Sequence, residues 1–285
     1  MLRNTIIYYS FFTWCWIIGH MPEKLIRAIG RGVGVFIYYI IPIRRSVSRK
    51  NIRLAFPKHD TGEIDRTQKK MYRHYGMVMM EFFSLPFLSS DKLGKKWGLS
   101  PDAENICQSH KNGIILSAHF GNWELIPHIL ASKGLSMIAI VRPQKNAGFD
   151  RMITRIRNSS GCKMISSKAS SRDILKEMPG NFLIVLGDQR GGRHGVDIDF
   201  FGKKARSPKG FCVFHLKTGI PIFFTTVTLG DDGRYFMNME EIKIDAGNAN
   251  IEEQIRIIDQ KYHHLLETEI KRYPEQYFWF HRKWL

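Results

Sequence analysis

The sequence predicts an α/β fold in which helices flank a mainly parallel central sheet. Four short apolar runs are suited to buried strands, and they lie at residues 113–118, 136–141, 181–187 and 220–229. Patterns with helical spacing follow these runs, at residues 123–132, 149–160, 171–178 and 207–218. Strands that alternate with helices in this order are typical of βαβ units, which build parallel sheets.

Two more elements complete this predicted domain, which we place at residues 101–285. A turn signal at residues 231–233 separates extended stretches at 225–229 and 235–239, which predicts a hairpin. An amphipathic pattern predicts a final long helix at residues 250–272. Ser207 precedes Pro208, and this pair is typical of a helix N-cap with proline at the first helical position.

Residues 1–100 are predicted to form a helical segment that docks on a membrane. Residues 5–18 carry no charge and are rich in aromatic side chains, and residues 28–43 are apolar except for Arg31. A third helical pattern covers residues 63–88. Basic residues follow the second apolar stretch, at positions 44, 45, 49, 50 and 53, where anionic lipid head groups would attract them. This pattern predicts the cytoplasmic face of a membrane.

The first apolar stretch is shorter than the ~20 residues that span a bilayer. It therefore either spans the membrane or lies in its interface, and a pair of buried core helices is the alternative interpretation of both stretches. The 285-residue chain carries 43 Lys and Arg against 26 Asp and Glu, a formal charge of +17, which favours an anionic partner. Because the aromatic residues gather in apolar stretches and are not interleaved with basic ones, we expect a membrane with anionic lipids and no nucleic acid.

The first candidate for chemistry is His119, directly after the first apolar run, where ligands bind in open α/β sheets. Glu124 follows five positions later, and a tight turn through Gly121 would fold its carboxylate back onto the imidazole. Such a contact fixes the histidine tautomer for a general base. On this spacing alone a structural histidine is the more common reading.

A metal-dependent hydrolase that uses His119, Glu124 and His128 is another possibility. The chain contains no motif that such sites use, so we expect His128 to be an exposed or capping side chain. The four cysteines lie far apart without a C-x-x-C pair, which indicates a reducing compartment. We expect no metal and no cofactor.

The string SAHFGNWEL at residues 117–125 resembles the H-x4-D/E motif of the lysophospholipid acyltransferase superfamily. Its Asn-Trp-Glu form is similar to the bacterial lipid A biosynthesis late acyltransferases. Three later blocks also resemble that family: Arg142-Pro143 with Arg155, then Asp188-Gln189 with residues 199–210, and finally residues 273–284. In the last block Lys283 stands where the family pattern leads us to expect a second arginine.

The resemblance implies an acyltransferase that moves a fatty acyl chain onto a hydroxyl of a lipid A precursor. The donor would be an acyl carrier protein or acyl-coenzyme A thioester, and the acceptor a phosphorylated glycolipid. His119 would be the general base, oriented by Glu124. Backbone N–H groups near Gly121 and Asn122, or the Arg142 side chain, are candidate donors to the tetrahedral intermediate. The substrate-binding residues implied are Arg142, Asn122, Asp188, Gln189 and Arg155. A lysophospholipid or a phosphatidylinositol mannoside is the alternative acceptor.

Overall fold

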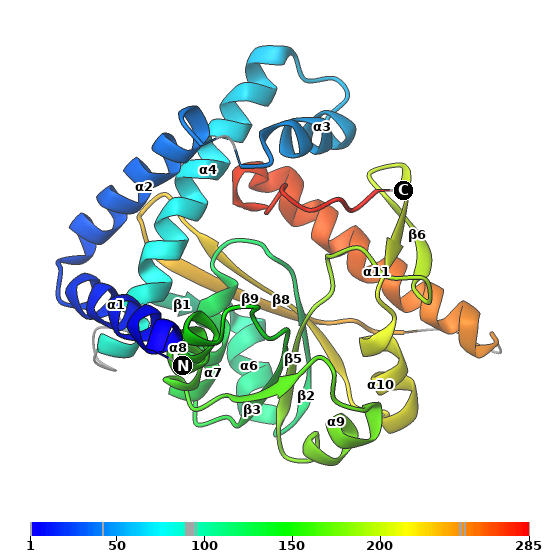
Figure 1. Ribbon diagram of the computed structural model, residues 1–285. Coiled ribbons are helices and arrows are strands. Elements are labelled where there is room, and N and C mark those ends of the chain that lie inside the picture. The colour runs from blue at the N-terminus through cyan, green and yellow to red at the C-terminus, as the bar shows by residue number, and fades with distance from the viewer. Residues whose placement is uncertain are drawn as a thin grey trace.

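The computed structural model describes residues 2–41, 43–88, 94, 96–244, 247 and 249–284. Within these residues a seven-stranded sheet has the order β1-β9-β8-β2-β5-β3-β4. Its parallel strands are β2 (Gly113–Ser117), β3 (Met137–Val141), β4 (Lys163–Ser166), β5 (Phe182–Leu186) and β8 (Ile222–Leu229). β9 (Tyr235–Glu241) runs antiparallel to β8, and β1 (Trp97–Leu99) pairs parallel with β9. The prediction of a mainly parallel central sheet is therefore confirmed (Figure 1).

The sheet places β2 at its centre, between β5 and β8, with all five of its residues buried. This burial on both faces explains why the strand is a continuous apolar run in the sequence. The predicted hairpin is confirmed, because Leu229 of β8 pairs with Tyr235 of β9. The Gly233 N–H donates to the Gly230 carbonyl within the turn, at 3.0 Å.

The helices that follow the strands surround the sheet in Figure 1. They are α6 (Pro101–Ser109), α7 (Ile126–Ser132), α8 (Ala147–Asn158), α9 (Ser171–Glu177), α10 (Gly210–Thr218) and α11 (Ile251–Arg272), with short 3-10 turns η2 (Trp123–Leu125) and η3 (Pro274–Gln276). Five of these helices match the predicted ones within a few residues. The sixth, α6, was not predicted, although Ser100 caps it and Pro101 opens it.

Ser207 is not the N-cap that the sequence predicted. It ends β7 (Lys203–Ser207), which pairs antiparallel with β6 (Val196–Phe200), and α10 begins only at Gly210 with Lys209 as its N-cap. Proline keeps the residue before it in an extended conformation, so Ser207 continues the strand. Its hydroxyl donates to the buried Asp259 carboxylate at 3.0 Å.

The two apolar stretches near the N-terminus both form helices, with bounds wider or shifted from those predicted. They are α1 (Leu2–Gly19) and α2 (Glu23–Tyr39), and they are followed by α3 (Arg45–Ala55), α4 (Thr61–Ser84) and η1 (Leu85–Phe87). α2 and α4 touch backbone to backbone: a Cβ added at Gly34 would lie 2.1 Å from the Tyr72 carbonyl oxygen. Asp60 and Glu63 form a capping box that starts α4.

Each apolar helix buries one side and exposes the other. Tyr8, Cys15 and Ile18 of α1 are buried, as is Ile26 of α2. The exposed large apolar side chains of this region are Leu2, Ile6, Tyr9, Trp14, Trp16, Ile17, Leu25, Val33, Phe36, Tyr39, Ile40, Ile41 and Ile43, which we call the apolar surface. Among the described residues, no helix has both the length and the apolarity needed to cross a membrane.

The boundary predicted near residue 100 falls one residue after β1, which already belongs to the sheet. Each of the two hydrophobic cores contains residues from both sides of it. One core joins Tyr75 and Val78 of α4 to the sheet, and the other joins Cys15 of α1 to Phe182 and Phe223. The N-terminal helices therefore share their cores with the α/β part.

As the pH falls, the protein should begin to lose stability at pH values well above the pKa of its carboxyl groups. Burial lowers the pKa of His74 and of His128 from 6.5 to about 4. Between pH 6.5 and 4 the unfolded chain therefore binds protons that the folded chain does not, so the free energy of unfolding falls as pH falls. We expect a loss on the order of 1–2 kcal/mol per histidine between pH 7.5 and 5 in urea unfolding experiments.

The variant His128→Asn removes one of these titrating groups and should reduce the pH dependence of the unfolding free energy. His194→Asn, at an exposed position, is the matched control and should keep the full dependence. Equal pH dependence in both variants and the wild type would contradict the assignment.

Candidate active site

His119 lies at the carboxyl edge of the sheet, two residues after β2 ends. The chain turns sharply here, and Gly121 has φ +58°. A Cβ at this position would lie 1.9 Å from the Val227 carbonyl oxygen, so only glycine fits. The prediction that Gly121 permits a tight chain path is confirmed.

Backbone hydrogen bonds hold the His119 loop against β8 and the C-terminal segment. The Gly121 N–H donates to the Gln276 carbonyl at 2.8 Å, and the Asn122 N–H to the Val227 carbonyl at 2.9 Å. The Phe278 N–H in turn donates to the His119 carbonyl at 2.9 Å. Because both loop N–H groups are already engaged, the expectation that they serve as oxyanion donors is wrong for this conformation.

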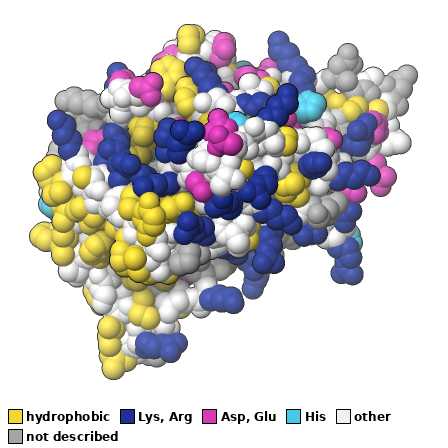
Figure 2. All heavy atoms as spheres, turned by 90° about the horizontal axis from the view of Figure 1, so that it is seen from above, with side chains coloured by type: hydrophobic (Ala, Val, Ile, Leu, Met, Phe, Trp, Pro, Cys, Tyr) yellow, Lys and Arg dark blue, Asp and Glu magenta, His cyan; other side chains and the backbone are white. Residues whose placement is uncertain are grey.

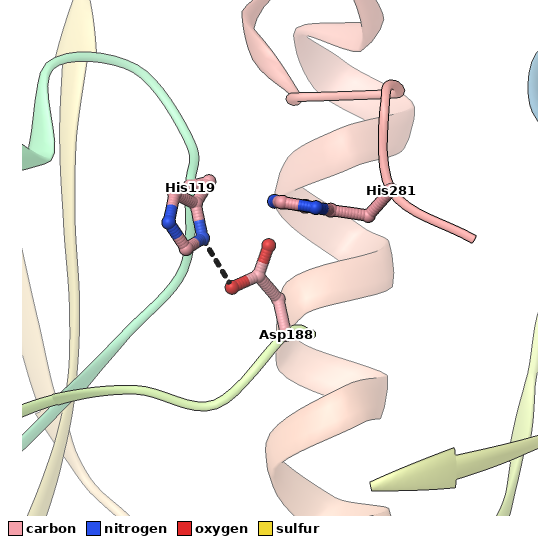
Figure 3. Close-up of side chains that lie close together, drawn as sticks. All are labelled: His119, Asp188 and His281. Atoms are coloured by element: carbon pink, nitrogen blue, oxygen red, sulfur yellow. Dashed lines mark hydrogen bonds and ion pairs between the residues drawn. The ribbon is translucent and has the colours of Figure 1, made fainter. Parts of the chain in front are cut away.

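The imidazole of His119 is bound to Asp188, the second residue after β5. Figure 3 shows the contact, in which His119 Nδ1 and Asp188 Oδ1 lie 2.8 Å apart. A carboxylate accepts only, so Nδ1 carries a proton, and the tautomer that this contact selects has its lone pair on Nε2. The Gln189 amide nitrogen lies 3.3 Å from that Nε2. His119 is thus held in the tautomer that a general base requires.

Glu124 does not fold back onto His119 as the sequence analysis expected. It lies in η2, and its two carboxylate oxygens accept from Arg157 of α8 at 2.6 and 3.1 Å. A bidentate arginine contact fixes both oxygens of a carboxylate, which explains why Glu124 is directed to α8. The carboxylate that orients His119 in this structure is therefore that of Asp188.

His128 is neither exposed nor capping, which corrects the other expectation for this region. It is only 6% exposed, within α7 and one turn after Glu124. The set of His119, Glu124 and His128, considered above only as an alternative, does not form a group of possible metal ligands in the described part of the chain. Ligand atoms of His119, Asp188 and His281 lie within 4.8 Å of one another, and two nitrogens and one oxygen form a donor set suited to zinc. Asp188 Oδ1 is hydrogen-bonded to His119 here.

Asp188 is completely buried, yet it is charged. Burial alone would raise its pKa, but the hydrogen bond and charge of His119, together with His281 and Lys283, lower it from 3.8 to about 2. Its other oxygen, Oδ2, is buried with no hydrogen-bond partner among the described residues. The carboxylate is therefore stabilised by nearby positive charge and by its bond to His119.

Lys283 supplies part of that positive charge from the C-terminal segment. Its side chain is 1% exposed, and its ammonium group donates to the Gln189 carbonyl at 3.3 Å. Burial lowers the pKa of Lys283 from 10.5 to about 8, against the opposing effect of Asp188 and Asp259. Sequence reasoning gave Lys283 no contact, because no local pattern indicates that a basic residue between His281 and Trp284 is buried.

His281 completes the cluster. Its ring centre lies 4.9 Å from that of His119, and its Nε2 lies 3.4 Å from the Gln189 amide nitrogen. Burial lowers the pKa of His281 to about 4, so the ring is neutral at pH 7. Figure 3 shows His119, Asp188 and His281 converging from three segments that are far apart in the sequence.

A cavity of about 590 Å³ opens beside His119. One part of its wall is apolar, formed by side chains of β3, β5 and their neighbours: Trp123, Pro127, Ala139, Ile140, Val141, Met164, Ile184, Val185 and Leu186. The other part is polar or charged, formed by Glu124, Arg142, Gln144, Arg157, Gln189 and Arg190. The cavity can therefore take an apolar chain and polar groups together.

The structure brings some of the predicted binding residues to this cavity and places others elsewhere. Arg142 and Gln189 line it, whereas Asp188 lies behind His119. Asn122 is 1% exposed, and its amide donates to the buried Glu81 at 3.1 Å. Arg155 contacts the Tyr8 hydroxyl of α1 at 3.1 Å. The contacts of Asn122 and Arg155 are thus internal ones.

The whole chain, residues 1–285, matches the model of a family described as bacterial lipid A biosynthesis acyltransferase. The chain belongs to this family. It is 27% identical over 281 residues to the lipid A biosynthesis palmitoleoyltransferase of Escherichia coli K12, a match covering 95% of this chain and 87% of that one. The predicted resemblance is confirmed, and the protein is an acyltransferase.

A second relative is the phosphatidylinositol mannoside acyltransferase of Mycolicibacterium smegmatis, 21% identical over 83% of this chain and 78% of the relative. Among solved structures, the 1-acyl-sn-glycerophosphate acyltransferase PlsC of Thermotoga maritima is similar at a TM-score of 0.40. It has 16% identity and covers 88% of this chain and 98% of that chain.

For this member of the lipid A acyltransferase family we expect Asp188→Asn to reduce the acyl transfer rate by about 10²–10⁴-fold, the range seen when the acid of a histidine pair becomes an amide. The cause would be loss of the tautomer, because an amide can donate to Nδ1 and move the proton to Nε2. ¹⁵N NMR of the imidazole should show this exchange directly.

The matched control is Asp199→Asn, at an exposed position on β6, which should leave both the rate and the His119 spectrum unchanged. Glu124→Gln should leave the tautomer in place. A wild-type rate for Asp188→Asn would show that Asp188 does not position the base.

Proposed function

We propose that the protein transfers a fatty acyl chain from an acyl thioester to a hydroxyl group of a lipid A precursor, with His119 as the general base. The observation that carries this proposal is the His119 ring, bound through Nδ1 to buried Asp188, with its Nε2 beside a half-apolar cavity. Membership of the lipid A acyltransferase family supports the reaction class.

The proposed chemistry needs one base and no covalent acyl-enzyme. The acceptor hydroxyl oxygen attacks the thioester carbonyl carbon while its proton passes to His119 Nε2. Asp188 stabilises the imidazolium that results. When the tetrahedral intermediate collapses, the carbon–sulfur bond breaks and His119 returns the proton to the leaving thiolate. The Gln189 amide and the Arg142 guanidinium, both lining the cavity, are the proposed donors to the oxyanion.

Glu124 is assigned to the binding of the acceptor, and it does not orient His119. It lies in the cavity wall with its carboxylate fixed by Arg157, so the pair presents a charge and a guanidinium edge to the substrate. Such a pair can fix a polar group of the acceptor. Loss of Glu124 would also release the Arg157 charge into the cavity.

We assign the acyl chain to the apolar part of the cavity wall and the acceptor to its polar and charged part. The apolar side chains of β3 and β5 suit the fatty acyl chain, because its burial removes apolar surface from water. The donor proposed is an acyl carrier protein or coenzyme A thioester, since either offers a thiolate leaving group. The acceptor proposed is a phosphorylated glycolipid, which suits the excess of Lys and Arg.

A phosphatidylinositol mannoside is the second candidate acceptor, favoured by the match to the mycobacterial relative. A lysophospholipid is the third. All three carry a hydroxyl nucleophile and a phosphate, so the base at His119 would serve each of them. The assay below distinguishes them.

We further propose that the apolar surface rests on the cytoplasmic face of the inner membrane. Figure 2 shows apolar side chains gathered on the side of the molecule formed by α1 and α2, with Lys and Arg side chains beside them. The apolar surface includes Trp14, Trp16, Tyr9 and Tyr39, each 44–58% exposed, and these residue types favour membrane interfaces. Anionic head groups would attract the neighbouring cations.

Purified protein should raise the mass of a lipid A precursor by one acyl group when an acyl thioester is supplied. His119→Ala should lower this rate at least about 10³-fold, because the base is lost. His194→Ala, at an exposed position, is the control and should transfer at the wild-type rate. Mass spectrometry of the acceptor measures both. Preferential acylation of a lysophospholipid or a phosphatidylinositol mannoside would refute the lipid A assignment.

Replacement of apolar side chains on α2 and just after it should weaken membrane binding. Phe36 and Ile40 are 52% and 65% exposed, and the double variant Phe36→Ser/Ile40→Ser should bind anionic phospholipid vesicles about ten-fold less tightly or worse. The matched control is Phe236→Ser/Ile251→Ser, which removes exposed apolar side chains from β9 and α11. Equal vesicle binding by both double variants in a sedimentation assay would contradict the proposed orientation.

A further inference from the structure

A second groove, of about 690 Å³, lies beside the active-site cavity. It is formed by α3, by Arg190 after β5, by the start of β7, and by the C-terminal segment. Five cationic side chains line it, with no acidic residue among its lining residues: Lys50, Arg190, Lys203, Lys204 and Arg282. We call it the cationic groove.

The five cations of this groove have no acidic partner in the described part of the chain, whereas their neighbours do. Arg49, next to Lys50, pairs with Asp65 at 2.6 Å, and Arg206 on β7 pairs with Asp197 at 2.6 Å. Even Lys204, whose cross-strand partner is Asp199, forms no ion pair with it among the described residues. Lys204 does lower the pKa of the nearby Asp197 carboxyl, which Arg206 already holds. The other four cations have no such carboxylate among the described residues, and this excess of positive charge favours a bound anion.

The cationic groove and the catalytic cavity are neighbours, because Arg190 lines both. Arg190 follows Gln189, whose amide lies 3.3 Å from His119 Nε2. On the other side, Arg282 follows His281, whose ring lies against that of His119. A molecule with an anionic group in the groove is therefore close enough to reach the base with another of its groups.

The groove also borders the apolar surface. Ser46, Val47 and Lys50 of α3 line it, and α3 starts two residues after Ile43, which is 54% exposed. Figure 2 shows Lys and Arg side chains across the middle of this face, next to the apolar side chains. A ligand whose apolar part lies in a lipid surface would thus meet the groove with its polar head group.

We infer that the cationic groove binds phosphate groups of the acceptor's head group and so places its hydroxyl at His119. Phosphate is the anion that several converging Lys and Arg side chains recognise, with arginine giving two parallel hydrogen bonds and lysine a point charge. The inference rests on the proposed function, since it names the subsite that would hold one of its two substrates.

The test is the triple variant Lys203→Gln/Lys204→Gln/Arg282→Gln, assayed in detergent micelles with a phosphorylated lipid A precursor. All three side chains are exposed, so folding should be preserved. The KM for the acceptor should rise at least about ten-fold, because three charge-assisted contacts are lost. The kcat at saturating acceptor and the KM for the acyl thioester should change by no more than about two-fold. The reason is that the variant removes acceptor-binding energy that is the same in the ground state and in the transition state.

The matched control is Lys111→Gln/Lys176→Gln/Lys217→Gln, which makes the same change in net charge at exposed positions before β2, β5 and β8. It should behave as wild type. A dephosphorylated acceptor provides a second comparison. Removal of the phosphates should raise the KM for the acceptor in the wild type and in the control. It should not raise the KM of the triple variant further.

Three results would overturn the inference. An equal effect of the triple variant and the control would assign the change to overall charge. A rise in the KM for the thioester alone would assign the groove to the donor. An unchanged KM for the acceptor would leave the groove without a role in binding it.

Binding measured without donor separates this inference from the proposed function. If the wild type transferred no acyl group, the proposed reaction would be wrong, yet micelles of the phosphorylated glycolipid should still bind the wild type at least about ten-fold tighter than the triple variant. If transfer occurred but binding were the same for both proteins, the groove assignment alone would be wrong.

Discussion

The hydrogen bond between His119 and Asp188 joins the ends of two neighbouring parallel strands, β2 and β5, and many other contacts of the site serve it. A buried carboxylate is costly unless positive charge and hydrogen bonds compensate for it. Lys283 provides part of that compensation from the C-terminal segment. The same segment fastens the His119 loop through Gln276 and Phe278. The imidazole is therefore oriented by contacts from three parts of the chain at once.

The sequence predicted most of the fold because the central strands are buried on both faces and appear as continuous apolar runs. The elements it missed have weaker signals. β4 has only two apolar residues, Met164 and Ile165, and lies at the edge of the sheet. β6 does carry a signal, since residues 196–200 alternate between apolar and acidic side chains, and only the apolar ones of that strand face inward. Ser207 was misread because an N-cap and a strand end before proline look alike in one sequence.

Part of the site was also predictable from the sequence. The motif at residues 117–125 located His119, and the rule for open sheets put residues after β2 and β5 together. Spacing alone could not decide which of two carboxylates reaches the imidazole, because the answer depends on Arg157. That arginine lies 33 residues after Glu124 and takes both of its oxygens. A long-range contact of this kind leaves no local trace in the sequence.

Lys283 has a consequence that an arginine in its place would not have. An arginine stays protonated under all ordinary conditions, whereas the pKa of Lys283 is lowered to about 8 by burial. In mildly alkaline solution the ammonium group becomes a neutral amine, and Asp188 and Asp259 lose a shared counter-charge inside the protein. The positive charge beside the histidine–aspartate pair can therefore be removed and restored by a change of pH around 8, through the single amine of Lys283.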